Sequence, residues 1–310
     1  MKMTRVRSWQ RGALAGVTAL LVIGLAWAGA GSSASAARPL RVVATTTQVT
    51  DFARIVAGNA AQVVGILPAN VDPHDYEAVP GDLQKLSSAD LLVENGAGME
   101  DAWMVNLLQS VHRRVRVVDT SRGISLLPGS RESPRGDPHI WFAVPNAAQM
   151  VANIRDAMAQ ADPANAAYYR ANAARYVPQL DALDKYIFAQ IATLPRAERK
   201  LVTSHDAFSY YVTRYGLTLV GAVIPSTNTE AEVSAQHLAQ LVRVIRSERV
   251  KAIFLETSVN PKVEEQIGQE AGVRVVTNLY GDTLGPAGSD GDTYLRMMRH
   301  NTDLIVSSLR

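Results

Sequence analysis

Three histidines and one aspartate occur at points of the sequence where side chains could act together. Each follows a short run of apolar, β-branched residues that predicts a strand: His74 in VDPHDYE, His139 in GDPHIWF, His205 in VTSHDAF and Asp282 in NLYGDTLG. In open α/β sheets, ligands collect in the crevice beyond the carboxyl ends of the strands. Three imidazoles and one carboxylate form a plausible closed tetrahedral site for a divalent ion, so we predict a metal site here.

The sequence around these four positions, and the placement of the other histidines and acidic residues, support this choice of ligands. The Asp-Pro before His74 and before His139 restricts the backbone, which helps to hold a ligand in place. The remaining histidines fall in predicted helices beside polar residues, and we expect them on solvated helix faces: His112, His237 and His300. Three acidic residues are candidate supporting or substitute ligands: Asp75, Glu77 and Glu256. For Glu256, capping or orienting the loop ETSVNPK is the better explanation, and we attribute the adhesion tripeptide Arg135-Gly136-Asp137 to chance.

A zinc-dependent hydrolase is the main enzymatic alternative. Catalytic zinc keeps one coordination position open for water, and Asp282 as a fourth ligand would close it. The sequence contains neither an HExxH nor a GxSxG pattern. Ser204-His205-Asp206 cannot form a catalytic triad, because consecutive side chains diverge. A binding protein is therefore favoured over an enzyme, and an adhesin or structural surface role stays open as a second function.

The composition excludes several other classes of protein. The chain of 310 residues has no cysteine, which excludes disulfides, thiolate nucleophiles, cysteine zinc fingers, iron–sulfur clusters and a lipidated cysteine. Hydrophobic residues make up 47% and charged residues 19%, so the chain can bury a sizeable core. Four of the 31 basic residues and none of the 29 acidic residues precede residue 37. The rest of the chain is thus weakly acidic and has no electrostatic case for binding nucleic acid.

Residues 1–36 predict a signal peptide for export. A basic stretch ends at Arg11, an apolar run extends from Ala13 to about Ala30, and the small residues Ala34-Ser35-Ala36 match a cleavage site. The apolar run is long enough that an uncleaved membrane anchor stays open as an alternative. Its glycines and alanines and the cleavage pattern favour removal. Since no cysteine is available for lipidation, we expect a mature chain that is free in the periplasm.

Predicted strands and helices alternate along the rest of the chain. Mostly apolar strands in such an alternation indicate parallel sheets covered by helices on both faces. Between the two halves, one long helix is predicted from an apolar stripe at helical spacing: Tyr169, Ala173, Tyr176, Leu180, Leu183, Ile187 and Leu194. We therefore expect an α/β fold of two lobes, each a mostly parallel sheet flanked by helices, joined by one long rigid helix. The expected ranges are 37–162 for the N-terminal α/β lobe, 163–194 for the linking helix and 195–310 for the C-terminal α/β lobe.

Several segments resemble the zinc/manganese-type periplasmic solute-binding proteins of ABC importers, the cluster A-I metal-binding family. The likeness follows the whole mature chain in order and rests on TTTQVTDFARIVAG, VDPHDYEAVPGDLQKLSSADLLVENGAGMEDAW, GDPHIWFAVPNAAQMVANI, LVTSHDAFSYYVTRYGL and FLETSVNPKVEEQIGQEAGV. The resemblance implies two lobes joined by a long rigid helix, one metal in the cleft and delivery of the ion to a membrane permease. The family's ligands fall on His74, His139, His205 and Asp282, the same set that placement after the strands indicates.

Two departures from the family and the ligand types bear on the metal. Ala78 replaces the usual proline after HDYE, and residues 121–137 form a short loop without histidine, so a zinc-scavenging role for this loop is not supported. Histidine at the third ligand position, here His205, is the choice that favours zinc within the family, whereas glutamate favours manganese. Three nitrogens and one carboxylate also suit Zn²⁺, while Mn²⁺ usually prefers more oxygen donors.

We therefore expect a monomer that carries Zn²⁺ to an ABC permease, and Mn²⁺ is the alternative cargo. A periplasmic metallochaperone is a further candidate partner.

Overall fold

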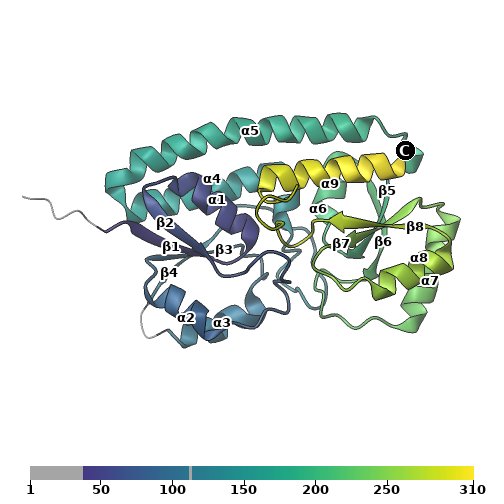
Figure 1. Cartoon of the computed structure of the whole chain (residues 1–310), viewed down its shortest axis with the longest axis horizontal. Helices are drawn as coiled ribbons and strands as arrows, with labels where there is room; N and C mark the ends of the chain where they lie inside the picture. The colour runs from purple at the N-terminus through teal and green to yellow at the C-terminus, as the bar shows by residue number, and fades with distance from the viewer. Residues whose placement is uncertain (1–37, 112–113) are drawn as a thin grey trace, which may run out of the picture. The chain divides into compact units, whose positions relative to one another are not determined.

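The computed structural model describes residues 38–111 and 114–310, so the predicted signal peptide and His112 lie outside the described residues. Residues 39–310 form one compact unit built on two four-stranded parallel sheets (Figure 1). The first sheet has the order β2-β1-β3-β4, with β1(Leu40–Ala44), β2(Ala61–Gly65), β3(Leu91–Glu94) and β4(Arg116–Asp119). The second has the order β6-β5-β7-β8, with β5(Lys200–His205), β6(Thr218–Ile224), β7(Ala252–Glu256) and β8(Arg274–Leu279). Both sheets thus have the same topology, and the predicted fold class is confirmed.

Helices cover both faces of each sheet. Those of the first half are α1(Thr47–Ala57), α2(Pro80–Ser87), α3(Asp101–Gln109) and α4(Val144–Ala161), with short 3-10 turns at Ile140–Phe142 and Pro163–Asn165. Those of the second half are α6(Ser209–Tyr215), α7(Ala235–Ser247), α8(Lys262–Ala271) and α9(Tyr294–Leu309), with a 3-10 turn at Arg196–Glu198. Alternate residues of β1 point to opposite faces, so that Val42 joins the core with α1 and α4 while Val43 joins the core with α2 and α3.

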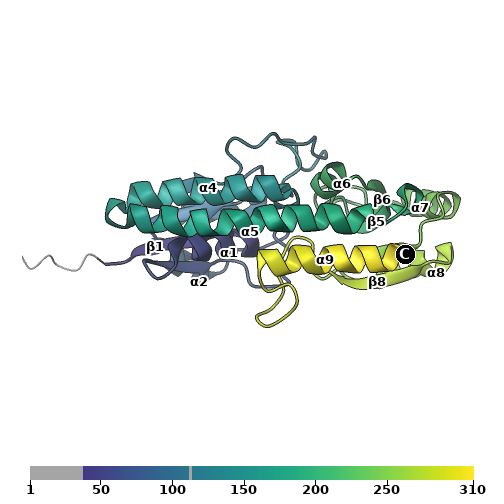
Figure 2. The same ribbon diagram turned by 90° about the horizontal axis from the view of Figure 1, so that it is seen from above.

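The long helix α5(Ala166–Ala192) follows the predicted apolar stripe and continues through Pro178. Its buried side chains include Tyr169, Tyr176, Leu180, Leu183 and Ile187. Figure 2 shows α5 running beside α4 and α9, which come from different halves of the chain. These helices share one continuous apolar core that also contains residues of both sheets. The two lobes are therefore joined by packing as well as by the chain itself, and the expected ranges 37–162, 163–194 and 195–310 stay a prediction.

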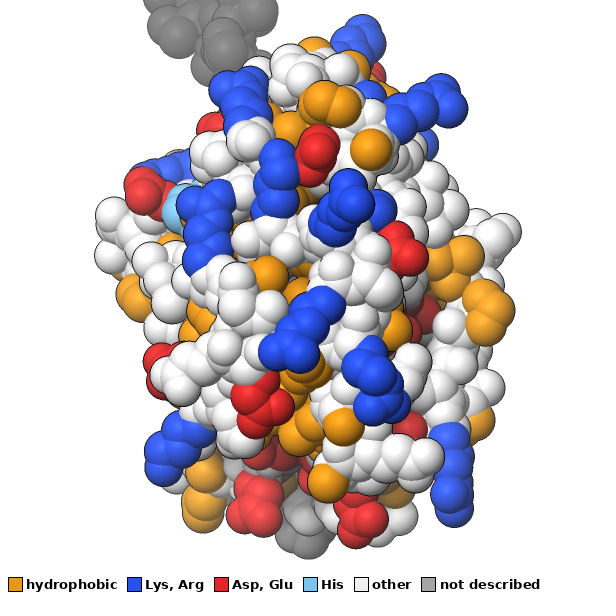
Figure 3. Space-filling model, turned by 90° about the vertical axis from the view of Figure 1, so that its right-hand side faces the viewer, with side chains coloured by type: hydrophobic (Ala, Val, Ile, Leu, Met, Phe, Trp, Pro, Cys, Tyr) orange, Lys and Arg blue, Asp and Glu red, His pale blue; other side chains and the backbone are white. Residues whose placement is uncertain are grey.

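Basic side chains are frequent on the end of the molecule shown in Figure 3. Some basic residues of the second half bind the carbonyl groups that a helix leaves free at its carboxyl end. Lys251 Nζ donates to Leu309 O and to Arg310 O at 2.8 Å each, and Arg274 donates to Ser308 O. A cation is favourable at the carboxyl end of a helix dipole. These two residues thus stabilise α9.

Among the described residues, no helix combines the length and apolarity that crossing a membrane requires.

We predict that metal loading changes the overall dimensions of the protein very little. Bending α5 would sacrifice backbone hydrogen bonds and the packing of Leu180 and Leu183, whereas a strand hinge flexes through a few dihedral angles. Small-angle X-ray scattering of the metal-free and zinc-loaded protein should give nearly equal radii of gyration. Protection from proteolysis should be confined to the loops that carry His74 and Asp282. A contraction of the size seen for wide hinge closure would contradict the stiff connection.

Candidate metal centre

The structure brings the four predicted residues together between the two sheets. His74 lies in the loop after β2, His139 in the long connection after β4, His205 at the end of β5 and Asp282 in the loop after β8. One nitrogen or oxygen atom of each lies within 4.8 Å of the corresponding atoms of the other three. All four residues are buried, with at most 2% of their surface exposed. Strands of both halves therefore supply this cluster, as their placement in the sequence predicts.

The distances within the cluster match a four-coordinate site. His139 Nε2 lies 3.4 Å from His74 Nε2 and 3.2 Å from His205 Nε2. The Asp282 oxygens lie 3.2 Å from His139 Nε2, 3.2 Å from His205 Nε2 and 3.5 Å from His74 Nε2. A tetrahedron whose centre is about 2.0–2.1 Å from each nitrogen, as for zinc, has edges of about 3.3 Å. The four side chains are thus spaced to hold one small divalent ion without rearrangement.

The carboxylate of Asp282 has no hydrogen-bond partner among the described residues, although both of its oxygens are buried. His139 Nε2 and His205 Nε2 lie 3.2 Å from its oxygens, contacts that pair with the carboxylate only while those rings are protonated. A buried carboxylate without a partner is costly, and native structures rarely leave one. A cation at the centre of the cluster would satisfy both oxygens, which makes the donor set well suited to a metal.

The two Asp-Pro-His segments have the same local structure. Asp72 Oδ1 accepts a hydrogen bond from the backbone amide of His74 at 2.8 Å, and Asp137 Oδ1 accepts one from the amide of His139 at 3.0 Å. Each aspartate therefore closes an Asx turn around the intervening proline, which fixes the direction in which the histidine leaves the backbone. The Asp-Pro pair thus restricts the backbone as expected from the sequence, and the aspartate contributes through this hydrogen bond.

Side chains from neighbouring elements hold both prolines. Trp103 Nε1, in α3, donates to Pro73 O at 3.0 Å. Asn95 Nδ2, just after β3, donates to Pro138 O at 3.0 Å. The first half of the chain thus fixes both histidine loops through their backbone carbonyls, in addition to the turns themselves.

Two of the three imidazoles are oriented by a carboxylate on their second nitrogen. His139 Nδ1 pairs with Asp137 Oδ1 at 2.7 Å, and His205 Nδ1 pairs with Glu256 Oε1 at 3.1 Å. Such a partner fixes the ring so that Nε2 faces the metal, and it raises the basicity of the ligand. Glu256 also accepts the amide of His205 at 3.1 Å, because β5 and β7 are neighbours in the sheet.

Not every expectation about the surrounding residues is met. Glu256 orients His205, although capping of its own loop was the preferred explanation for this residue. Asp137 orients His139, although it was expected to be only part of a chance tripeptide. Asp75 and Glu77 are exposed and are not part of the cluster. His237 and His300 lie in α7 and α9 as expected, but their rings are partly buried and bind Ala222 O and Asn278 O at 2.9 Å each.

The buried charges shift the pKa values of the cluster in opposite directions. Burial by itself would lower the pKa of His139, but Asp282 and Asp137 more than offset it and raise the pKa to about 9. For His205, Glu256 and Asp282 likewise outweigh burial and hold the pKa well above its usual value. Burial lowers the pKa of His74 to about 3. The pKa of Asp282, which burial alone would raise, is held well below its usual range by His205 and His139.

Comparison with known proteins finds similar chains across almost the whole length. The family model described as zinc-uptake complex component A, periplasmic (ZnuA) matches residues 42–308. The manganese-binding lipoprotein MntA of Halalkalibacterium halodurans is 34% identical over 94% of this chain and 96% of that protein. The manganese ABC transporter substrate-binding lipoprotein PsaA of Streptococcus pneumoniae is 30% identical over 93% and 95%. The solved periplasmic zinc-binding protein TroA of Treponema pallidum has a TM-score of 0.81 and 31% identity, over 87% of this chain and 99% of that chain.

We predict that loading the cluster with a divalent ion releases protons. The pKa of His139 is raised to about 9, so this ring is charged at pH 7.5, and the pKa of His205 is also raised, whereas metal ligation requires neutral rings. Binding should therefore release at least one proton per ion at pH 7.5, and the affinity should still rise between pH 7.5 and pH 9. Calorimetry in buffers of different ionisation enthalpy measures this release. Imidazoles with the ordinary pKa of about 6.5 would release almost none at this pH, and that result would contradict the electrostatic description.

Proposed function

The chain belongs to the ZnuA family of zinc-uptake components, and from this premise we propose that it captures a divalent transition metal and delivers it to the permease of an ABC importer. One observation carries the proposal. Asp282 is a buried carboxylate without a hydrogen-bond partner among the described residues, and the Nε2 atoms of three imidazoles lie within 3.5 Å of its oxygens. A divalent cation at that point would satisfy all four groups with the three rings neutral.

In this proposal His74, His139, His205 and Asp282 bind the transported ion. Zinc is the favoured cargo, since three nitrogens and one carboxylate at tetrahedral spacing suit Zn²⁺ better than Mn²⁺. The names of relatives support both ions, because MntA and PsaA are named for manganese whereas TroA is titled a zinc-binding protein. Manganese is therefore the competing cargo in our proposal.

A transport role explains the site better than hydrolysis does. The relative PsaA is named a substrate-binding lipoprotein of an ABC transporter, and MntA is named a manganese-binding lipoprotein. A hydrolase would need an open coordination position for water, and Asp282 is placed to fill it. The protein's part is to hold the ion in a closed set of ligands until the permease accepts it, so we propose that the chain is not an enzyme.

Several relatives are named lipoproteins, and this chain has no cysteine that could carry a lipid. We propose that residues 1–36 direct export and that the mature protein acts in the periplasm as a free monomer of two lobes, 37–162 and 195–310, with a linking helix at 163–194. The permease is its partner, and a periplasmic metallochaperone is a second candidate partner.

Metal binding by the purified protein tests the proposed function. After chelation, the wild-type chain should bind one Zn²⁺, and Mn²⁺ should compete only at higher concentration. His139→Ala removes one ligand, so its affinity loss should exceed the about 10- to 100-fold typical for losing a supporting residue.

His237→Ala is the matched control, because that ring binds Ala222 O on β6 and lies outside the cluster. Its affinity should stay within about twofold of the wild type. Equal binding by wild type and His139→Ala would overturn the ligand assignment, and absence of stoichiometric binding of either ion would overturn the function.

A further inference from the structure

A loop of the first half reaches the second half beside the metal centre. Residues 127–137 lie in the connection between β4 and His139, and the two ends of this loop meet where the Asp137 amide donates to Leu127 O at 2.9 Å. The interior of the loop is tightly folded, since a Cβ on Gly129 would lie 2.1 Å from Ser133 O. The loop is thus a compact unit with a narrow base next to the ligand His139.

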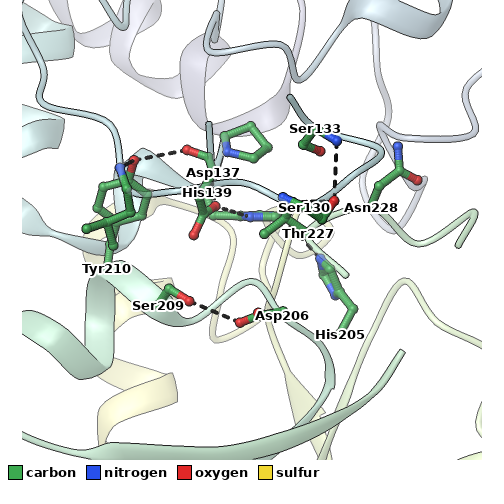
Figure 4. Close-up of polar contacts among 12 residues, drawn as sticks. Ser130, Ser133, Asp137, His139, His205, Asp206, Ser209, Tyr210, Thr227 and Asn228 are labelled. Atoms are coloured by element: carbon green, nitrogen blue, oxygen red, sulfur yellow. Dashed lines mark hydrogen bonds and ion pairs between the residues drawn. The ribbon is translucent and has the colours of Figure 1, made fainter. Parts of the chain in front are cut away.

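One hydroxyl of the second half holds both ends of this loop. Tyr210, in α6, accepts a hydrogen bond from the Leu127 amide at 2.9 Å and donates one to Asp137 O at 3.0 Å. Figure 4 shows Tyr210 beside Asp137 with this contact drawn. The side chain of Tyr210 is 5% exposed. Burial raises its pKa to about 12, so the hydroxyl keeps the proton that it donates.

The far end of the loop has a second attachment to the same half. The Ser130 amide donates to Thr227 Oγ1 at 3.1 Å, Thr227 Oγ1 donates to Ser130 Oγ at 3.0 Å, and Ser226 Oγ donates to Glu132 Oε2 of the loop at 3.0 Å. Ser226 and Thr227 are 3% exposed, so water competes little for these bonds. The loop is therefore held at its tip and at its base by residues that follow β5 and β6 of the second sheet.

We propose that Tyr210 is a positioning residue for the metal, acting through Asp137 on His139 across the boundary between the two halves. Tyr210 fixes the backbone of Asp137, and the Asp137 side chain fixes the ring of His139 through the 2.7 Å contact with Nδ1. The inference rests on the proposed function. It adds that metal affinity depends on contact between the lobes, because a hydroxyl of one lobe helps to hold the aspartate that orients a ligand of the other.

The ordinary alternative is that Tyr210 only satisfies two backbone groups and contributes to stability. The next residue provides a matched control for this alternative. Tyr211 is fully buried on the same helix, and its hydroxyl shares a hydrogen bond of 2.9 Å with Thr302 Oγ1 in α9. Tyr210→Phe and Tyr211→Phe each remove one buried hydroxyl from α6. Only the first change reaches the metal centre.

Zinc affinity and thermal stability of the two variants test the proposal. Both should lower stability, Tyr210→Phe somewhat more, since its hydroxyl makes two hydrogen bonds and that of Tyr211 makes one. Tyr210→Phe should weaken Zn²⁺ binding about tenfold, as expected for loss of a supporting group of a metal ligand, while Tyr211→Phe should stay within about twofold of wild type.

A double-mutant cycle separates positioning from a general effect. Asp137→Ala frees the His139 ring, so adding Tyr210→Phe to it should cause less than about a twofold further loss. Full multiplication of the two losses would overturn the proposal, and so would equal zinc affinities of Tyr210→Phe and Tyr211→Phe. If His139→Ala still weakens zinc binding by more than about 100-fold in that case, only this inference fails. If wild type and His139→Ala bind alike, the proposed function fails first.

Discussion

The metal centre depends on a negative charge that is buried between two sheets. Asp282 is 1% exposed and accepts no hydrogen bond from the described residues, so its charge must be balanced by neighbouring cations. Asp282 in turn contributes to raising the pKa values of His139 and His205, so protons on these rings are favoured when no metal is bound. In the proposed function, a divalent ion takes the place of those protons between the same four side chains, so binding and proton release are coupled.

The scaffold supplies this centre with little freedom to move. In each sheet the order of the strands changes direction beside the first strand, between β1 and β3 in one sheet and between β5 and β7 in the other. At that point of the second sheet, β5 and β7 place His205 and Glu256 side by side. The helices α5 and α9 then join both sheets through one apolar core. The loop of Asp282 is also held by the first half, because Thr47 Oγ1 accepts the amide of Leu284 at 2.7 Å. Ligand geometry is thus a property of the joined lobes, and neither lobe contains the site alone.

Much of this arrangement could be predicted from the sequence, because it depends on local patterns. The apolar stripe of α5 and the position of each metal-centre residue after a strand can be read from nearby residues. The partners of the imidazoles could not be found in this way. Glu256 lies 51 residues from His205, and Tyr210 lies 73 residues from Asp137, so only the tertiary fold brings them together. Asp137 did have a local signal, since it precedes His139 by two residues as Asp72 precedes His74.

The central claim is that three imidazoles and one carboxylate surround the transported ion. X-ray absorption spectroscopy of the zinc-loaded protein counts these ligands directly, because imidazole rings give a characteristic outer-shell scattering. We expect a four-coordinate ion with three nitrogen donors at about 2.0–2.1 Å, one carboxylate oxygen at about 2.0–2.2 Å, and outer-shell scattering from three rings. A spectrum that requires two or fewer imidazoles, or a shell made mainly of water oxygens, would contradict the account.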